Sequence, residues 1–187
     1  MINVALQMLV RDNRDYIKNG FIPYFEEFEK THPHINLHYY FLENDSCDGS
    51  EVIISDFLAA HPGVLKSSAL GVLEKSAAVL SPESAAKMHK MAGLRTELNA
   101  LIEDHSKYDF ILFVDTDILF TTDAIKQFIK TLTENPEIGQ ISGNGAIRDG
   151  TWKGLYYDTW ACEFLDGKTP HGHSKDPALF PQGCTSK

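Results

Sequence analysis

Two carboxylates, Asp115 and Asp117, stand one residue apart directly after the apolar run at residues 111–114. Carboxylate oxygens suit a hard divalent cation such as Mg²⁺ or Mn²⁺, and a bound cation in turn binds phosphate oxygens. A short apolar run between polar turns is typical of a buried central strand in a parallel sheet, and ligands bind beyond the carboxyl ends of such strands. The motif therefore predicts a site for a metal and a phosphate group. The alternative is that both residues are ordinary loop acids.

A second polar loop, at residues 43–50, follows another predicted strand and contains Asn44, Asp45 and Asp48. The carboxyl ends of neighbouring parallel strands share one edge of a sheet, so we expect both loops at that edge. There Asn44 or Asp45 can hydrogen-bond a nucleotide base or ribose, while Asp117 binds a metal on a diphosphate and Asp115 contacts the ribose or the metal. For Asp48 the favoured interpretation is capping of the helix that follows.

The elements that must position these loops alternate along the chain. Apolar runs predict strands at residues 4–10, 36–42, 111–114 and 138–142, and a short strand near 71–73. Helical spacing of apolar residues predicts helices at 16–30, 51–60, 84–105 and from 122 or 123 to 134. Strand and helix in alternation predict an α/β fold with a mostly parallel sheet and helices on both faces. At 187 residues we expect one domain, 1–187.

Composition excludes several classes of partner. The formal net charge of -9, from 17 basic and 26 acidic residues, argues against a nucleic-acid surface or an anionic membrane surface. The three cysteines are widely spaced, which favours a reducing compartment over a disulfide framework or a zinc site. The sequence has no pattern of a signal peptide and no apolar run of membrane-spanning length, so we expect a cytoplasmic protein without a membrane span.

Four motifs between residues 4 and 166 together resemble a known family. They are the E-N-D-S-C-D-G segment at 43–49, Arg95 with Asn99, F-V-D-T-D at 113–117, and Y-Y-D-T-W-A at 156–161. In this order they resemble the nucleotide-sugar glycosyltransferases of the GT-A fold. The last motif is most similar to fungal capsule-type mannosyltransferases and related viral glycosyltransferase domains, which leaves a viral origin open.

The resemblance implies a single GT-A, Rossmann-like domain that transfers a sugar from a nucleotide-diphosphate donor to a glycan acceptor with retention of configuration. The donor would be a UDP- or GDP-sugar, and the cofactor would be Mn²⁺ or Mg²⁺. The nucleotide-binding part would span about 1–120 and the acceptor side about 121–187.

The resemblance also implies roles for individual residues. The metal ligands would be Asp115, Asp117 and His173. The catalytic residues would be Asp158 and Arg95. The nucleotide-sugar would be bound by Arg11, Asn13, Asn44, Asp45, Arg95, Asp115, Tyr157 and Trp160. Structural alternatives stay open for three of these assignments: Arg95 as a surface arginine, Tyr157 or Trp160 as a core aromatic, and His173 as a surface histidine.

Two other functions compete with this hypothesis. One is a non-catalytic module that binds a nucleotide-sugar. The other is a phosphatase of the haloacid-dehalogenase type, in which the first Asp of D-x-D is the nucleophile. That class carries the motif on its first strand, with Thr or Val two residues after it. Here the motif comes late in the chain and Leu119 occupies the Thr or Val position.

Overall fold

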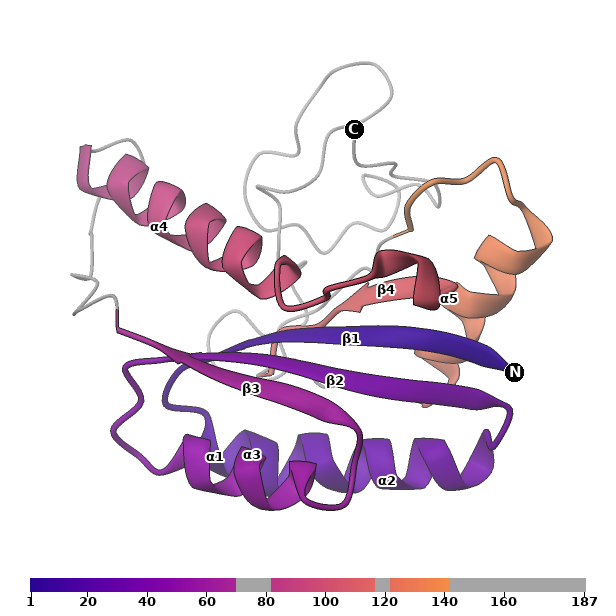
Figure 1. Ribbon diagram of the computed structural model, residues 1–187, viewed down its shortest axis with the longest axis horizontal. Helices are drawn as coiled ribbons and strands as arrows, with labels where there is room; N and C mark the ends of the chain where they lie inside the picture. The colour runs from indigo at the N-terminus through magenta and orange to yellow at the C-terminus, as the bar shows by residue number, and fades with distance from the viewer. Residues whose placement is uncertain (70–81, 117–121, 142–187) are drawn as a thin grey trace, which may run out of the picture. The chain divides into compact units, whose positions relative to one another are not determined.

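Two apolar segments from the first quarter of the chain form the long central strands of a parallel sheet (Figure 1). The computed structural model describes residues 1–69, 82–116 and 122–141. Strand β1 (Ile2–Val10) pairs with β2 (Ile35–Asn44), in a register that runs from Ile2 opposite Ile35 to Val10 opposite Glu43. Within the described residues the strand order is β3-β2-β1-β4, and every neighbouring pair is parallel. The predicted α/β class with a parallel sheet is confirmed.

The chain divides into two compact units, Met1–Phe120 and Thr121–Lys187. The remaining elements of the first unit are α1 (Arg14–Tyr16), the π-helix η1 (Ile17–Phe21), α2 (Ile22–Thr31), α3 (Ser50–Leu58), β3 (Gly63–Ser68), α4 (Pro82–Asn99), the 3₁₀ helix η2 (His105–Lys107) and β4 (Phe110–Phe113). In the second unit the described element is α5 (Thr122–Glu134), which agrees with the predicted helix.

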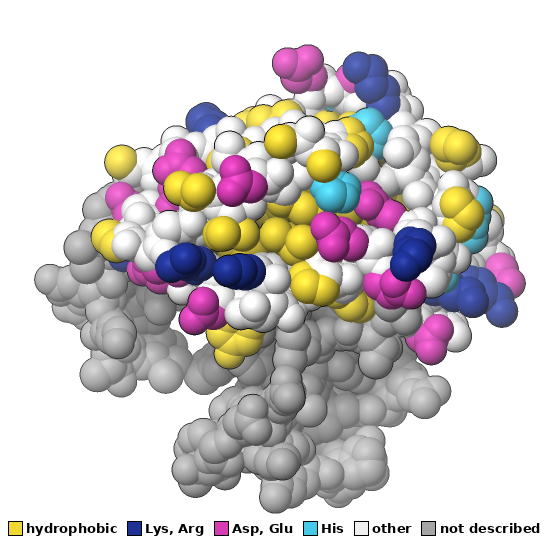
Figure 2. Space-filling model, turned by 90° about the horizontal axis from the view of Figure 1, so that it is seen from below, with side chains coloured by type: hydrophobic (Ala, Val, Ile, Leu, Met, Phe, Trp, Pro, Cys, Tyr) yellow, Lys and Arg dark blue, Asp and Glu magenta, His cyan; other side chains and the backbone are white. Residues whose placement is uncertain are grey.

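Aromatic side chains fill the space between the sheet and helices α2 and α3, which lie below the sheet in Figure 1. The rings of Tyr39 on β2 and Phe57 on α3 meet edge to face, 4.9 Å apart. Phe21 and Phe25 supply the next layer, with ring centres 4.5 Å apart. Edge-to-face rings add directional attraction to the burial of their apolar surface. Figure 2 shows the outside of this helical layer, where acidic, basic and apolar side chains are interspersed.

Helix α4 covers the opposite face of the sheet. Its residues Leu94 and Leu98, together with Ile102 beyond its end, pack on Tyr40 and Leu42 of β2. Side chains alternate along a strand, so Tyr40 and Leu42 face α4 while Tyr39 faces the aromatic layer. Helices on both faces of the sheet are therefore confirmed, and the apolar stripe predicted for this helix is its packing face.

The third described strand, β3, is one that the sequence did not predict. Strand β3 runs from Gly63 to Ser68, whereas the prediction placed a short strand near residues 71–73, which lie outside the described residues. Strand β3 is largely exposed and lacks a continuous apolar run, so periodicity does not reveal it. Its first residue must be glycine, because a Cβ at Gly63 would lie 2.3 Å from the carbonyl oxygen of Tyr39.

The predicted helix at 16–30 begins two residues earlier, at Arg14, and contains the π-turn η1. Pro23, in the first turn of α2, accounts for the π-turn. Proline lacks an N–H, and its ring collides with the carbonyl four residues before it, so a regular α-helix cannot continue across it. The wider π-turn before α2 takes up the mismatch.

Two further predictions are wrong in part. Strand β4 was expected to be buried, but Ile111 and Phe113 are 45% and 42% exposed, because β1 is its one neighbour among the described strands. Residues 138–141 are irregular where a strand was predicted. In the part of the chain that the structure describes, no helix has the length and apolar character needed to cross a membrane.

Candidate functional site

The loops that follow β1, β2 and β4 meet at the carboxyl edge of the sheet. The register places Gln7 opposite Phe113 and Val10 opposite Glu43. If the same register continues past the strand ends, Asp12 lies opposite Asp45. The loop that begins at Arg11 then also lies close to Thr116. The polar residues predicted to bind a ligand therefore lie at one end of the sheet, as expected for parallel strands.

Hydrogen bonds interlock the loops after β1 and β2. The backbone N–H of Asp12 donates to Ser46 Oγ at 3.0 Å, and the N–H of Cys47 donates back to Asp12 Oδ1 at 2.8 Å. The N–H of Asn13 donates to Ser50 Oγ at 3.1 Å. Because these bonds join residues more than thirty positions apart, the two loops form one preorganised surface.

Asp48 organises the start of α3 and also holds the first turn of α1. Its carboxylate accepts from the N–H and hydroxyl of Ser50 at 2.9 and 2.6 Å, and from the N–H of Arg14 at 2.8 Å. Partial burial raises the pKa of Asp48, but the hydrogen bonds from Ser50 and Arg14 outweigh it and lower the pKa below its usual value. The structural role predicted for Asp48 fits these contacts. Between Asp48 and the helix, Gly49 takes the left-handed conformation, with φ of 85°.

A hydrogen bond joins the acidic motif after β4 to this pair of loops. Asn13 Nδ2 donates to Thr116 Oγ1 at 2.6 Å, and Thr116 Oγ1 donates to the carbonyl of Leu9 at 3.4 Å. The N–H of Val114 continues the sheet ladder by donating to the carbonyl of Gln7 at 3.0 Å. The chain is thus anchored to β1 on both sides of Asp115, which is half-buried at the edge of the sheet.

Two aspartates of this surface have left-handed backbone conformations. Asp12 has φ of 48° and Asp45 has φ of 54°, and the extended register of β1 and β2 makes their positions equivalent. Non-glycine residues rarely adopt this conformation, which costs energy that the surrounding hydrogen bonds must offset. Strained backbone of this kind concentrates at ligand-binding loops, which supports a functional interpretation of this edge.

The other predicted residues of the first unit occupy different settings. Asn44 is the last residue of β2, not a loop residue, and is only 4% exposed. Arg11 is half-buried, with Nε 4.0 Å from Asp12 Oδ2. Arg95 lies exposed on α4, with its guanidinium over the ring of Phe113. Five predicted residues lie outside the described residues: Asp117, Tyr157, Asp158, Trp160 and His173.

The described residues provide one of the three predicted metal ligands. Asp115 is a half-buried carboxylate at the edge where parallel sheets bind ligands, so its donor chemistry fits a hard cation. Among the described residues no group of three or more acidic, histidine or cysteine side chains could hold a metal ion. Since Asp117 and His173 are outside those residues, Mn²⁺ or Mg²⁺ binding stays a prediction.

Sequence reasoning missed several residues that shape this surface. Glu43 is only 5% exposed, and its carboxylate accepts from the N–H of Ser46 at 2.6 Å. Asp12 and Thr116 join neighbouring loops but belong to no periodic pattern. One signal was present in the sequence, namely a threonine between two acids at the end of a strand. Because side chains alternate along an extended chain, this pattern favours burial of the threonine.

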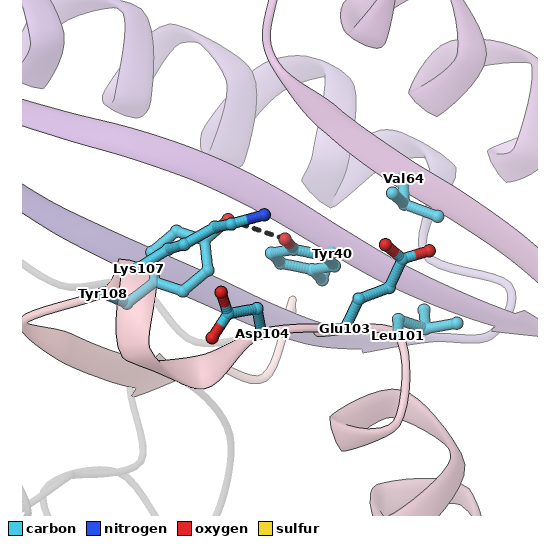
Figure 3. Close-up of a pocket in the computed structure, with 7 residues that line it drawn as sticks. All are labelled: Tyr40, Val64, Leu101, Glu103, Asp104, Lys107 and Tyr108. Carbon is cyan, nitrogen blue, oxygen red and sulfur yellow. Dashed lines mark hydrogen bonds between the residues drawn. The ribbon is translucent and has the colours of Figure 1, made fainter.

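A separate pocket of about 220 Å³ lies on the α4 side of the sheet, toward the amino end of β4 (Figure 3). The hydroxyls of Tyr40 and Tyr108 form a 2.7 Å hydrogen bond there, and Lys107 and Glu103 stand at its rim. Burial, followed by the hydrogen bond with Tyr108, raises the pKa of Tyr40 above its usual value. The Tyr40 hydroxyl therefore stays neutral at physiological pH. This pocket contains none of the predicted site residues.

The comparisons with known proteins give no family. No protein-family model matches the chain, and no curated protein matches it either. Interpretation of the candidate site therefore rests on its residues and geometry.

Proposed function

We propose that this protein is a metal-dependent glycosyltransferase of the GT-A type. It transfers a sugar from a UDP- or GDP-sugar to a carbohydrate acceptor, with retention of configuration. The α/β fold with its parallel sheet is consistent with such an enzyme. The more specific assignment depends on the resemblance of four motifs and on the geometry of the carboxyl edge.

One observation carries the proposal. The 2.6 Å hydrogen bond from Asn13 to Thr116 links the loop after β1 to the middle residue of the Asp115-Thr116-Asp117 motif. The loop after β2 is interlocked with the same β1 loop through Ser46. Polar groups from three neighbouring strands therefore converge at the edge where parallel α/β sheets bind nucleotides.

Each group has a role that its chemistry suits. Asp115 and Asp117 would supply oxygen ligands to Mn²⁺ or Mg²⁺, with His173 as the third ligand. When bound, the cation stabilises the charge of the departing diphosphate. Asp45 and Asn44 would contact the base or ribose, and the remaining predicted residues would align donor and acceptor: Arg11, Asn13, Arg95, Tyr157, Asp158 and Trp160. Alignment of two reactants can lower the activation barrier by several kcal/mol, because the entropic cost of bringing them together is met when they bind.

The electrostatics of the chain make a cation necessary under this proposal. The net charge is -9, and the acidic neighbours of a diphosphate at this edge would include Asp12, Asp45 and Asp115. A carboxylate-rich surface repels a diphosphate unless a bound cation makes the local electrostatic potential positive. Nucleotide binding should therefore need the metal.

The test is calorimetric titration of UDP, GDP and their sugar conjugates into the protein, first with Mn²⁺ and then with EDTA. We expect one nucleotide to bind in the presence of Mn²⁺ only. The Asp117→Ala variant should lose this binding. The Asp56→Ala variant is the matched control, because it removes the same charge from an exposed position on α3.

Two results would contradict the proposal. Failure of every nucleotide to bind the folded protein with Mn²⁺ present would overturn the nucleotide-sugar assignment. Unchanged affinity in Asp117→Ala would overturn the metal assignment. Binding with neither sugar transfer nor hydrolysis of the sugar conjugate would instead identify a non-catalytic binding module.

A further inference from the structure

Two residues on one side of helix α4 contact a pair of residues that lie opposite each other on neighbouring strands of the sheet. Gln7 on β1 is in register with Phe113 on β4. Gln7 Nε2 donates to Asn99 Oδ1 at 3.2 Å, and the guanidinium carbon of Arg95 lies 5.7 Å from the centre of the Phe113 ring. Residues four apart lie on the same side of a helix, so one side of α4 contacts both members of the pair.

Phe113 contributes to this contact although it is not a core residue. It is 42% exposed, whereas Gln7 in the same pair is 1% exposed. A cation over an aromatic face within about 6 Å is attracted to the ring electrons, so the separation from Arg95 is in the effective range. The exposed ring therefore has a local function, which is to support the guanidinium.

The same ring lies at the end of β4, two residues before Asp115. Burial alternates from Phe113 to Thr116, with Val114 and Thr116 buried and the other two residues more exposed. Neighbouring side chains of an extended segment point to opposite sides, and those two apart point to the same side. By this burial pattern Phe113, with the Arg95 guanidinium over it, belongs with Asp115 to the more exposed side of the chain.

A guanidinium supported by a ring keeps its hydrogen-bonding capacity. Its N–H donors lie in the guanidinium plane and form a fork that matches the oxygens of a phosphate group. Arg95 is exposed, and among the described residues it forms no ion pair. Contact with a ring also restricts the many rotamers of an arginine, which reduces the entropy lost when the side chain binds an anion.

We infer that Phe113 is a positioning residue, which holds the guanidinium of Arg95 for a phosphate group bound beside Asp115. The inference rests on the proposed function, because the phosphate would be that of a nucleotide diphosphate. Phe113 itself does not touch the ligand. It acts through Arg95, and the Gln7 to Asn99 hydrogen bond fixes the helix that carries this arginine.

The test is a double-mutant cycle on the full chain, with UDP and GDP titrated in the presence of Mn²⁺. We expect Arg95→Met to weaken binding about tenfold or more, which is the size of a charge-assisted hydrogen bond. Phe113→Leu should weaken binding about two- to fivefold, which corresponds to a cation–π contact at an exposed site. In the Arg95→Met background, Phe113→Leu should have no further effect. Phe113→Trp should retain the wild-type affinity.

Ile111→Ala is the matched control, because Ile111 is an exposed apolar residue on the same strand and the same face as Phe113. Its nucleotide affinity should be unchanged, and thermal unfolding should verify that every variant is folded. Failure of both nucleotides to bind the wild-type protein would overturn the proposed function together with this inference. If a nucleotide binds, the positioning role is refuted in either of two cases. One is an unchanged affinity in Phe113→Leu or in Arg95→Met. The other is an equal loss from Phe113→Leu with and without Arg95.

Discussion

Replacement of Asn13 by alanine tests whether the junction between the β1 loop and the acidic motif shapes the candidate site. The substitution removes the donor to Thr116 Oγ1 at 2.6 Å. The backbone bonds of Asn13 to Ser50 and Ile17 do not involve its side chain and are retained. Within the described part of the protein, the substitution therefore removes only the hydrogen bond that links the two loops. A direct contact of the Asn13 side chain with the nucleotide would add to the loss of affinity.

The expected cost follows from the surroundings of Thr116. A hydrogen bond contributes about 0.5–1.5 kcal/mol net, and up to about 3 kcal/mol when a buried partner is left without any bond. Thr116 is 4% exposed, but its hydroxyl still donates to the carbonyl of Leu9. Asn13→Ala should therefore lower the free energy of unfolding by about 1 kcal/mol, as for a hydrogen bond whose buried partner keeps another bond. In a chain of this size that corresponds to a fall of about 3 °C in Tm.

The same cost should appear in nucleotide affinity if binding requires the joined loops. A loss of about 1 kcal/mol corresponds to about a fivefold rise in Kd for UDP or GDP with Mn²⁺, measured by calorimetric titration. Asn36→Ala is the matched control. Asn36 also donates a side-chain amide bond, to Asn3 Oδ1 at 3.1 Å, but near the amino end of β2. It should lower Tm without changing Kd. An unchanged Kd in Asn13→Ala, or an equal rise in Asn36→Ala, would refute the reasoning.

Three further predictions concern stability, pH and the metal. Gly63→Ala should destabilise the protein by about 1–3 kcal/mol in a denaturant titration, because its Cβ would lie 2.3 Å from the carbonyl oxygen of Tyr39. An unchanged midpoint would contradict the pairing of β3. Because the pKa of Asp48 is lowered on folding, its stabilising effect is present above about pH 4 and is lost as the pH falls through the lowered pKa. The difference in unfolding free energy between the wild type and Asp48→Asn should therefore shrink as the pH falls from 6 to 3. A difference that stays constant would argue against a lowered pKa of Asp48 in the folded protein. With His173 as a metal ligand, His173→Ala should weaken Mn²⁺-dependent nucleotide binding less than Asp117→Ala does, whereas an unchanged affinity would exclude His173 from the metal site.

The central part of the fold follows from apolar periodicity, and the edges do not. Strands β1 and β2 are long apolar runs buried on both faces, so their type and order are readable from the sequence. Strand β3 has mostly exposed residues, and its place is set by pairing with β2 and by the close approach at Gly63. The sequence analysis overestimated the burial of β4, because the number of strands that pair with a strand cannot be read from its own residues.

The candidate site was predictable in its location but not in its connections. The acids after the strands at residues 44 and 113 are visible as motifs, and parallel pairing places them at one edge. The bonds that fix their geometry join residues distant in sequence, such as Asn13 with Thr116, and have no period to detect. Buried acceptors such as Glu43 were missed for the same reason, because one buried hydrogen bond to a loop N–H determines the position of its carboxylate.

The contacts of Thr116 fix the position of the loop that carries Asp115. Its hydroxyl lies between the side-chain amide of Asn13 and the carbonyl of Leu9, so this residue is held against β1. Thr116 is 4% exposed, whereas the preceding Asp115 is half-buried, so the anchored residue lies inside and the carboxylate is the more accessible of the two. The anchoring of Thr116 therefore fixes the loop that carries Asp115, and a change at Thr116 should disturb ligand binding without removing a single ligand atom.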